Sequence, residues 1–145
     1  MPGLVLAIVF PATSFHLIDS VSKKIRSVRA MARRVGLDNV TAHHVRAERW
    51  PGAVTHSVSR ATAPLLTLWE WHKQVEMPMR PVQGAWNPGL ICLKGGALTE
   101  EVDALLKSDP TVDVTTHPLP SWIGSEGFEE KVIVEVKTEY QEGAS

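Results

Sequence analysis

Charged residues directly follow four of the strands that the sequence predicts. Asp19, Glu48, Arg60 and Lys94 all stand at or just beyond the end of a predicted strand. In doubly wound sheets, ligands bind outside the carboxyl ends of the strands. A carboxylate in that place can hydrogen-bond ribose hydroxyls, so Asp19 is a candidate to hold a nucleotide or adenosyl cofactor. The alternative for Asp19 is to cap the following helix, a role that Ser20 also fits.

The first residues have the pattern of a glycine loop that leads into a helix. Met1-Pro2-Gly3 stands before the apolar run 4–10, which Pro11 ends. The strand and basic helix that follow give the order of a nucleotide-binding α/β half without its first strand. We therefore expect the chain to begin inside this motif and the fold to lack its first strand and most of the glycine-rich loop.

Helical and strand patterns alternate along the chain. One helix is amphipathic, because apolar residues recur every three or four positions until Gly36 ends it. In a later helix we expect Ser59 or Thr62 as the cap and Pro64 in the first turn. The expected helices cover 4–10, 20–35, 62–75 and 99–106, the expected strands cover 14–18, 39–45, 54–59, 89–93, 112–117 and 131–136, and a loop covers 77–88.

Length and composition indicate one globular domain. The 145 residues are 43% hydrophobic, which suffices for a core, and we expect a domain over 1–138 with a disordered acidic tail over 139–145. The net charge of -1 favours neither nucleic acid nor membrane, but basic residues gather between 23 and 49. Cys92 is the only cysteine, so no disulfide forms within the chain. The apolar N-terminal run is too short to span a bilayer, and we expect a cytoplasmic protein.

Several other chemistries find little support in the sequence. His43 and His44 are adjacent in a predicted strand and must point to opposite faces, so we expect no metal site. No Ser/His/Asp or Cys/His arrangement stands out, which argues against a hydrolase. The basic residues of the helix over 20–35 fit an ordinary solvated face, whereas Arg46 and Arg49 lie closer to the predicted ligand edge. Lys94 either binds RNA or simply ends its strand.

Four segments together resemble one known family. HLIDSVSKKI, NVTAHHVRAE, VSRATAPLLTLW and LKGG are similar to the ribosomal small-subunit methyltransferase G family, also called glucose-inhibited division protein B. The resemblance covers nearly the whole chain, and the combination of SRA, an apolar helix and LKGG is specific. It implies a Rossmann-like class I S-adenosylmethionine-dependent methyltransferase fold. It also implies methyl transfer to N7 of a guanine in 16S ribosomal RNA.

The resemblance assigns cofactor-binding roles position by position. Met1 and Gly3 match the end of the family's glycine-rich loop, and Asp19 matches the acid after the second strand. Upstream of SRA, the family often has an Asp where this chain has Thr55 and His56. The remaining matches are Ala47 and Glu48, the pair near the adenine, and Arg60, the arginine of SRA; Arg46, Arg49 and Lys94 are the RNA-binding candidates.

The implied reaction requires alignment more than proton transfer. N7 of guanine already carries a lone pair, so no general base is required and no catalytic residue is assigned; alignment alone can contribute roughly 7–11 kcal/mol in good cases. The implied partner is 16S ribosomal RNA in the small ribosomal subunit, bound by a monomer. We expect this chain alone to bind S-adenosylmethionine weakly, if at all. The alternatives are an inactive, RNA-binding remnant of the family and a nicotinamide-dependent oxidoreductase.

Overall fold

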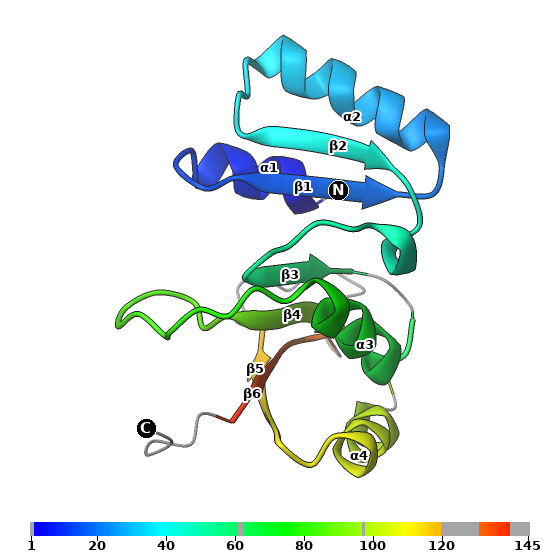
Figure 1. Ribbon diagram of the computed structural model, residues 1–145, viewed down its shortest axis with the longest axis vertical. Helices are drawn as coiled ribbons and strands as arrows, with labels where there is room; N and C mark the ends of the chain where they lie inside the picture. Colours follow the sequence, from blue (N-terminus) through cyan, green and yellow to red (C-terminus); the bar gives the residue numbers. More distant parts are fainter. Residues whose placement is uncertain (1, 61–62, 97, 120–130, 140–145) are drawn as a thin grey trace. The chain divides into compact units, whose positions relative to one another are not determined.

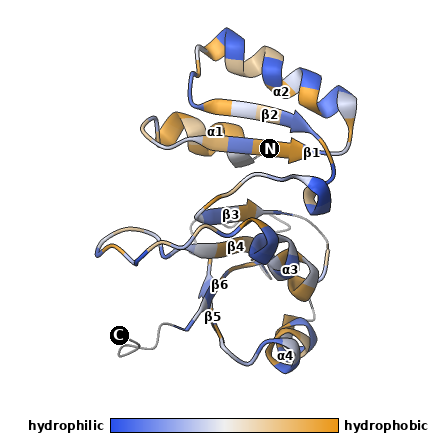
Figure 2. Ribbon diagram, in the orientation of Figure 1, coloured by the Kyte–Doolittle hydropathy of each residue, from blue (hydrophilic) through white to orange (hydrophobic). Residues whose placement is uncertain are grey.

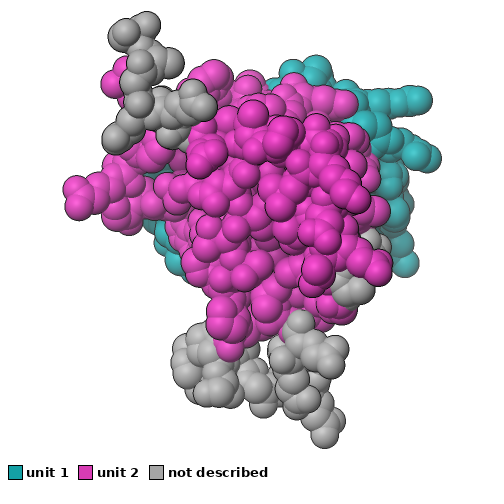
Figure 3. All heavy atoms as spheres, turned by 90° about the horizontal axis from the view of Figure 1, so that it is seen from below, with its two compact units in different colours: residues 1–52 teal, residues 53–145 magenta. Residues whose placement is uncertain are grey.

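The computed structural model describes residues 2–60, 63–96, 98–119 and 131–139 (Figure 1). The chain divides into two compact units, residues 1–52 and 53–145 (Figure 3). Each unit contains a pair of parallel strands with helices packed on its sheet. Met1, most of the expected tail 139–145 and Thr62 lie outside the described residues.

The first unit is a two-stranded parallel sheet with helices beside it (Figure 1). β1 and β2 run in register from Phe15 opposite Val40 to Asp19 opposite His44. The unit's elements are α1 (Pro2–Val9), β1 (Phe15–Asp19), α2 (Ser22–Val35), β2 (Val40–His44) and the short 3-10 helix η1 (Ala47–Arg49). Its buried apolar residues are Ala7, Leu17, Ile25, Val28 and Ala32.

Helix α2 forms as its sequence pattern predicts. Hydrophobic and hydrophilic residues alternate along it (Figure 2), and its buried residues Ile25, Val28 and Ala32 are spaced at three and four positions. Gly36 ends the helix with a φ of 78°, and its amide donates hydrogen bonds to Ala32 and Arg33 carbonyls. Only glycine adopts this left-handed conformation without a steric cost, which confirms Gly36 as the stop.

Helix α1 is held on β1 by a close approach and by one side chain. A Cβ on Gly3 would lie 2.9 Å from Cγ of Leu17, so the absence of a side chain lets the helix approach the strand. At the other end of α1, Asn39 Nδ2 donates to the carbonyl groups of Ala7, Phe10 and Thr13. The bond to Ala7 satisfies a carbonyl that the helix end leaves without an intrahelical partner, and the other two hold the turn that follows the helix.

The second unit is a four-stranded mixed sheet in the order β3-β4-β6-β5. β3 and β4 are parallel, whereas β6 pairs antiparallel with both β4 and β5. The elements are β3 (His56–Ser59), α3 (Leu65–Val75), β4 (Gly89–Lys94), α4 (Leu98–Ser108), β5 (Val112–Pro118) and β6 (Val132–Thr138). The core consists of Leu65, Leu68, Trp69, Leu90, Cys92, Leu105, Val112, Val134 and Val136.

The expected helices and strands all appear in the expected order, with one correction at the start of α3. Ser59 belongs to β3, and the residue at the helix cap is Pro64, which makes no side-chain capping bond. The prediction placed Pro64 inside the first turn. Pro64 lacks an amide hydrogen, so it fits a position where that donor has no intrahelical acceptor.

Within the described residues, β1 pairs only with β2, and β3 pairs only with β4. In this part of the chain, each of the two is therefore an edge strand of its own sheet. None of the helices in the described part of the chain is long and apolar enough to cross a membrane.

Candidate functional site

The carboxyl ends of β1 and β2 meet at one edge of the first unit. The strands are parallel, and Asp19 stands opposite His44 in the register. Two contacts join the segments just beyond them: the Val45 amide donates to the Asp19 carbonyl at 3.1 Å, and Nε2 of His44 lies 3.1 Å from the Ser20 carbonyl oxygen. Residues that follow the two strands are thereby brought together at this edge, as the sequence predicts.

Asp19 is half-buried, and its carboxylate is fixed by the backbone. Its Oδ1 accepts a hydrogen bond of 2.8 Å from the Val21 amide. The helix cap of α2 is Val21 itself, which makes no side-chain capping bond. Asp19 therefore closes the turn before the helix rather than capping the helix. A carboxylate has about four lone-pair sites, so this bond leaves Asp19 able to accept ribose hydroxyls as well.

The residues after β2 form η1, which carries both predicted kinds of site residue. Ala47 is half-buried, whereas Glu48 and Arg49 are exposed. Arg46 precedes them and lies 4.0 Å from the Glu48 carboxylate, and the two side chains are 70% and 40% exposed. A cavity of about 370 Å³ opens here, and it is lined by Ser20, His44, Val45, Arg46 and Arg49. Both RNA-binding candidates of this unit therefore line one cavity.

Arg60 and Lys94 belong to the second unit and are described there. Arg60 is exposed just after β3, whereas Lys94 is only 5% exposed at the end of β4. The Lys94 Nζ donates to the Ala63 carbonyl at 2.5 Å and to Oε1 of Glu101 at 2.8 Å. These bonds serve the fold, so the burial of Lys94 gives no support to its predicted contact with RNA.

Glu101 completes this buried arrangement. Its Oε1 also accepts a hydrogen bond of 2.8 Å from the Leu65 amide at the start of α3. Burial would raise the pKa of Glu101, but the bonds from Lys94 and from the Leu65 amide outweigh it and hold the pKa below its usual value. The carboxylate is thus kept charged beside the Lys94 ammonium, and together they tie β4, α3 and α4.

Thr55 and His56, the two residues that stand where the family often has an Asp, both make hydrogen bonds. Thr55 Oγ1 lies 2.7 Å from Nδ1 of His56, and Nε2 of His56 lies 2.9 Å from the Trp86 carbonyl oxygen. The His56 ring therefore ties the start of β3 to the loop over 77–88. Both ring nitrogens of His56 are therefore engaged within the unit.

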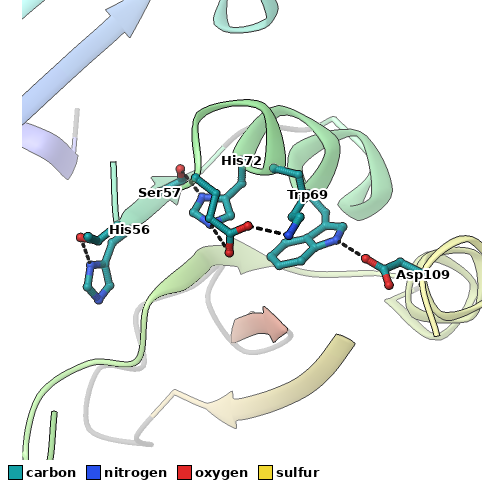
Figure 4. Close-up of polar contacts among 8 residues, drawn as sticks. His56, Ser57, Trp69, His72 and Asp109 are labelled. Carbon is teal, nitrogen blue, oxygen red and sulfur yellow. Dashed lines mark hydrogen bonds and ion pairs between the residues drawn. The ribbon is translucent and has the colours of Figure 1, made fainter. Parts of the chain in front are cut away.

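Two hydrogen bonds beside α3 were not predicted from the sequence (Figure 4). Ser57 Oγ and Nδ1 of His72 are 2.7 Å apart, and Nε1 of Trp69 donates to Oδ2 of Asp109 at 3.1 Å. Burial is the main reason that the pKa of His72 is lowered to about 4. His72 is 1% exposed, so no substrate reaches it. The two hydrogen bonds attach α3 to β3 and to the end of α4.

A second cluster on the first unit also went unpredicted. His16 Nδ1 lies 3.0 Å from Nε2 of His43, and the Trp50 ring lies 5.1 and 5.5 Å from the two imidazoles. Trp50 packs so closely on Gly52 that a Cβ there would lie 2.1 Å from the indole. His16 and His43 are diagonal neighbours on the paired strands β1 and β2. Their contact depends on the register between the two strands, which neither strand's sequence specifies alone.

Among the described residues, no group of three or more His, Cys, Asp or Glu is placed to hold a metal ion. Asp19, Arg46, Ala47, Glu48 and Arg49 share the strand-end edge of the first unit. Gly3 contacts Leu17 in the same unit, and its role there is to permit helix packing. The predicted role of Met1 falls outside the described residues.

Residues 1–111 match the family model for rRNA small subunit methyltransferase G, also named GidB. The chain belongs to this family. It is 48% identical over 140 residues to a protein of Salinibacter ruber named Ribosomal RNA small subunit methyltransferase G, a match that covers 95% of this chain and 65% of the relative. A protein of the same name from Bacteroides thetaiotaomicron is 41% identical, with 92% of this chain and 61% of the relative covered. The chain thus spans less than two thirds of the length of these relatives.

Solved structures confirm the fold predicted for the family. A rRNA methylase from Streptococcus thermophilus matches with a TM-score of 0.58 and 10% identity, over 88% of this chain and 74% of that one. A putative rRNA-methylase from Clostridium thermocellum matches with a TM-score of 0.56 and 14% identity over the same shares of the two chains. At these identities the likeness shows the fold alone, an α/β arrangement of the class I methyltransferase type.

Proposed function

We propose that this protein transfers a methyl group from S-adenosylmethionine to N7 of a guanine in 16S ribosomal RNA. The observation that carries the proposal is the family match over residues 1–111, joined to an acid and an Ala-Glu pair at one strand-end edge. An activity on ribosomal RNA belongs in the cytoplasm. The family match favours methyl transfer over the nicotinamide-dependent alternative, for which SRA and LKGG offer no hydride-transfer partner.

The residues of the first unit suit an adenosyl group. Asp19 is held by the Val21 amide in one orientation, and its remaining lone pairs are suited to accept ribose hydroxyls. Ala47 gives a small apolar surface and Glu48 a hydrogen-bond acceptor just beyond the neighbouring strand. S-adenosylmethionine supplies an electrophilic methyl group on a sulfonium when it is bound. The residues of this chain are proposed to bind the cofactor and the guanine and to orient them, because guanine N7 already holds the lone pair that attacks.

The direct test measures transfer of labelled methyl to small ribosomal subunits that lack this modification. The Salinibacter ruber relative serves as a control for the assay, since it is 48% identical to this chain. Transfer by this chain supports the proposal. Binding of the subunits without transfer supports the alternative of an RNA-binding remnant, and stronger binding of NADH than of S-adenosylmethionine supports the oxidoreductase.

Cofactor binding by Asp19 is tested with Asp19→Asn, which keeps an oxygen for the Val21 amide. Hydrogen bonds to a charged acceptor contribute roughly 1.5–3 kcal/mol, so calorimetry should show S-adenosylmethionine binding weakened by about tenfold or more. Asp38→Asn is the matched control, because Asp38 is an exposed acid of the same unit, in the turn before β2. Equal affinity of Asp19→Asn and the unaltered chain would remove Asp19 from the site.

A further inference from the structure

The cavity beyond β1 and β2, here called the arginine pocket, has the composition of an anion site. Its lining residues are Ser20, His44, Val45, Arg46 and Arg49. At about 370 Å³ it falls in the size range of sites for small ligands. Glu48, the one acid with an ion pair to a lining arginine among the described residues, lies 4.0 Å from Arg46 with both side chains well exposed. An exposed pair of this kind contributes little, so both arginines keep their capacity to bind another anion.

The start of α2 adds to the positive potential beside the pocket. The helix begins at Ser22, two residues after Ser20, and its first turn contains Lys23 and Lys24 but no acid. Its cap residue Val21 makes no side-chain capping bond. The amino end of a helix carries a partial positive charge that favours anions. Asp19 is the opposing charge here, and its carboxylate is engaged by the Val21 amide.

The arginines, rather than the histidine, must carry anion binding. Nε2 of His44 faces the carbonyl oxygen of Ser20 at 3.1 Å. A carbonyl only accepts hydrogen bonds, so Nε2 of His44 donates to Ser20 and is not available to a ligand. Guanidinium groups present a planar fork of donors that matches the oxygens of a phosphate. Arg46 and Arg49 therefore supply the donors, and the His44–Ser20 contact shapes the pocket.

We propose that the arginine pocket binds a backbone phosphate of the RNA substrate through Arg46 and Arg49. This inference rests on the proposed function in one respect, that RNA is the substrate. It places the phosphate at the carboxyl edge of β1 and β2, beside the residues assigned to the cofactor. An interaction of this kind positions the RNA strand and carries no sequence information.

The test uses the whole chain and a short single-stranded RNA labelled for fluorescence anisotropy, titrated at several salt concentrations. The double variant Arg46→Gln with Arg49→Gln removes the donors of the pocket. Arg33→Gln with Arg34→Gln is the matched control, because these are exposed arginines of the same unit at the opposite end of α2. Both variants remove the same charge, and thermal unfolding checks that both remain folded.

The pocket variant should bind RNA at least about tenfold more weakly, and the slope of log affinity against log salt should fall by about 0.7 for each phosphate that is no longer bound. The control variant should bind less than about threefold more weakly and keep the slope, because its arginines touch no phosphate. Equal weakening in both variants would overturn the proposal, and so would an unaltered chain that binds no RNA.

Two further readouts separate this inference from the proposed function. If the pocket variant loses affinity for S-adenosylmethionine but keeps its RNA affinity, the pocket belongs to the cofactor and the inference fails while the methyltransferase proposal stands. If no protein transfers methyl but RNA binding still depends on Arg46 and Arg49, the methyltransferase proposal fails and the pocket remains an RNA site.

Discussion

His72 is a buried histidine whose neutral form suits the fold and whose charged form does not. It is 1% exposed, its Nδ1 is bonded to Ser57, and its Nε2 lies 4.0 Å from the Glu76 carboxylate. Burial lowers its pKa from 6.5 to about 4, although the Glu76 charge acts in the opposite direction. In the unfolded chain, the ring takes up a proton near its ordinary pKa. Acid therefore favours the unfolded chain at this residue.

The change His72→Gln should flatten the pH dependence of stability. In the unaltered protein, stability is constant above pH 6.5 as far as His72 is concerned, and it falls as the pH drops from 6.5 towards 4. The slope in that window is about 1.4 kcal/mol for each pH unit. Glutamine cannot titrate, yet its amide can still bond Ser57. Urea unfolding at pH 7, 6 and 5 measures the slope, and a variant as sensitive to acid as the unaltered chain would contradict the assignment.

The positions of residues that follow a strand could be predicted from the sequence. Contacts between residues of two different elements could not. Asp19 and Glu48 follow strands whose parallel order is implied by the alternation of elements, so their shared edge could be inferred. The Ser57–His72 bond joins a strand to a helix, and the burial of Lys94 depends on Glu101 from α4. Both contacts depend on how the helices pack against the sheet, which the local sequence pattern does not specify.

The Lys94–Glu101 pair connects three elements of the second unit. Lys94 ends β4, Glu101 stands in the first turn of α4, and both bond the segment that starts α3, through the Ala63 carbonyl and the Leu65 amide. The pair holds the start of α3 against β4 and α4. Its removal should therefore lower the stability of this unit.

Lys94→Met should destabilise the protein by roughly 3–5 kcal/mol, because Glu101 is left charged and partly buried without its cation. Adding Glu101→Gln should recover part of the loss, since a neutral amide is less costly to bury. The control Glu100→Gln changes an exposed acid in the same helical turn and should stay within about 0.5 kcal/mol. Thermal and urea unfolding measure all three, and a double variant no better than Lys94→Met would argue against charge as the cause.

The order of helices and strands followed from the sequence, but the order of strands in space did not. Helical spacing and Gly36 defined α2, and the short apolar runs defined β4 and β6. The position of β6 between β4 and β5 arises from pairing between segments distant along the chain. A Cβ on Gly89 would lie 2.3 Å from the Val136 carbonyl oxygen, so the glycine permits β4 to pair with β6. A glycine at this position in the sequence does not predict which strand it will face.

The two units differ in how much apolar surface they bury. The core of the second unit includes Trp69, Cys92, four leucines and three valines, packed between α3, α4 and a four-stranded sheet. Among the described residues, the first unit buries five apolar side chains around two strands, and it leaves Val5, Ile8 and Val9 of α1 more than half exposed. A two-stranded sheet is marginally stable in water, and small units bury a smaller share of their surface. The proposed cofactor residues of the first unit therefore stand on the less stable scaffold.

Hydrogen exchange should reveal this difference directly. Amides in β1 and β2 should exchange at least about tenfold faster than those in β4 and β6, because local opening free energy follows the packing of each unit. Saturating S-adenosylmethionine should slow exchange in the first unit if Asp19, Ala47 and Glu48 bind it, since a ligand that binds only the folded form adds its binding free energy to stability. Mass spectrometry of peptides from both units measures the two effects. Equal protection throughout would mean that the chain opens as one cooperative unit, and protection confined to the second unit would move the cofactor site away from β1 and β2.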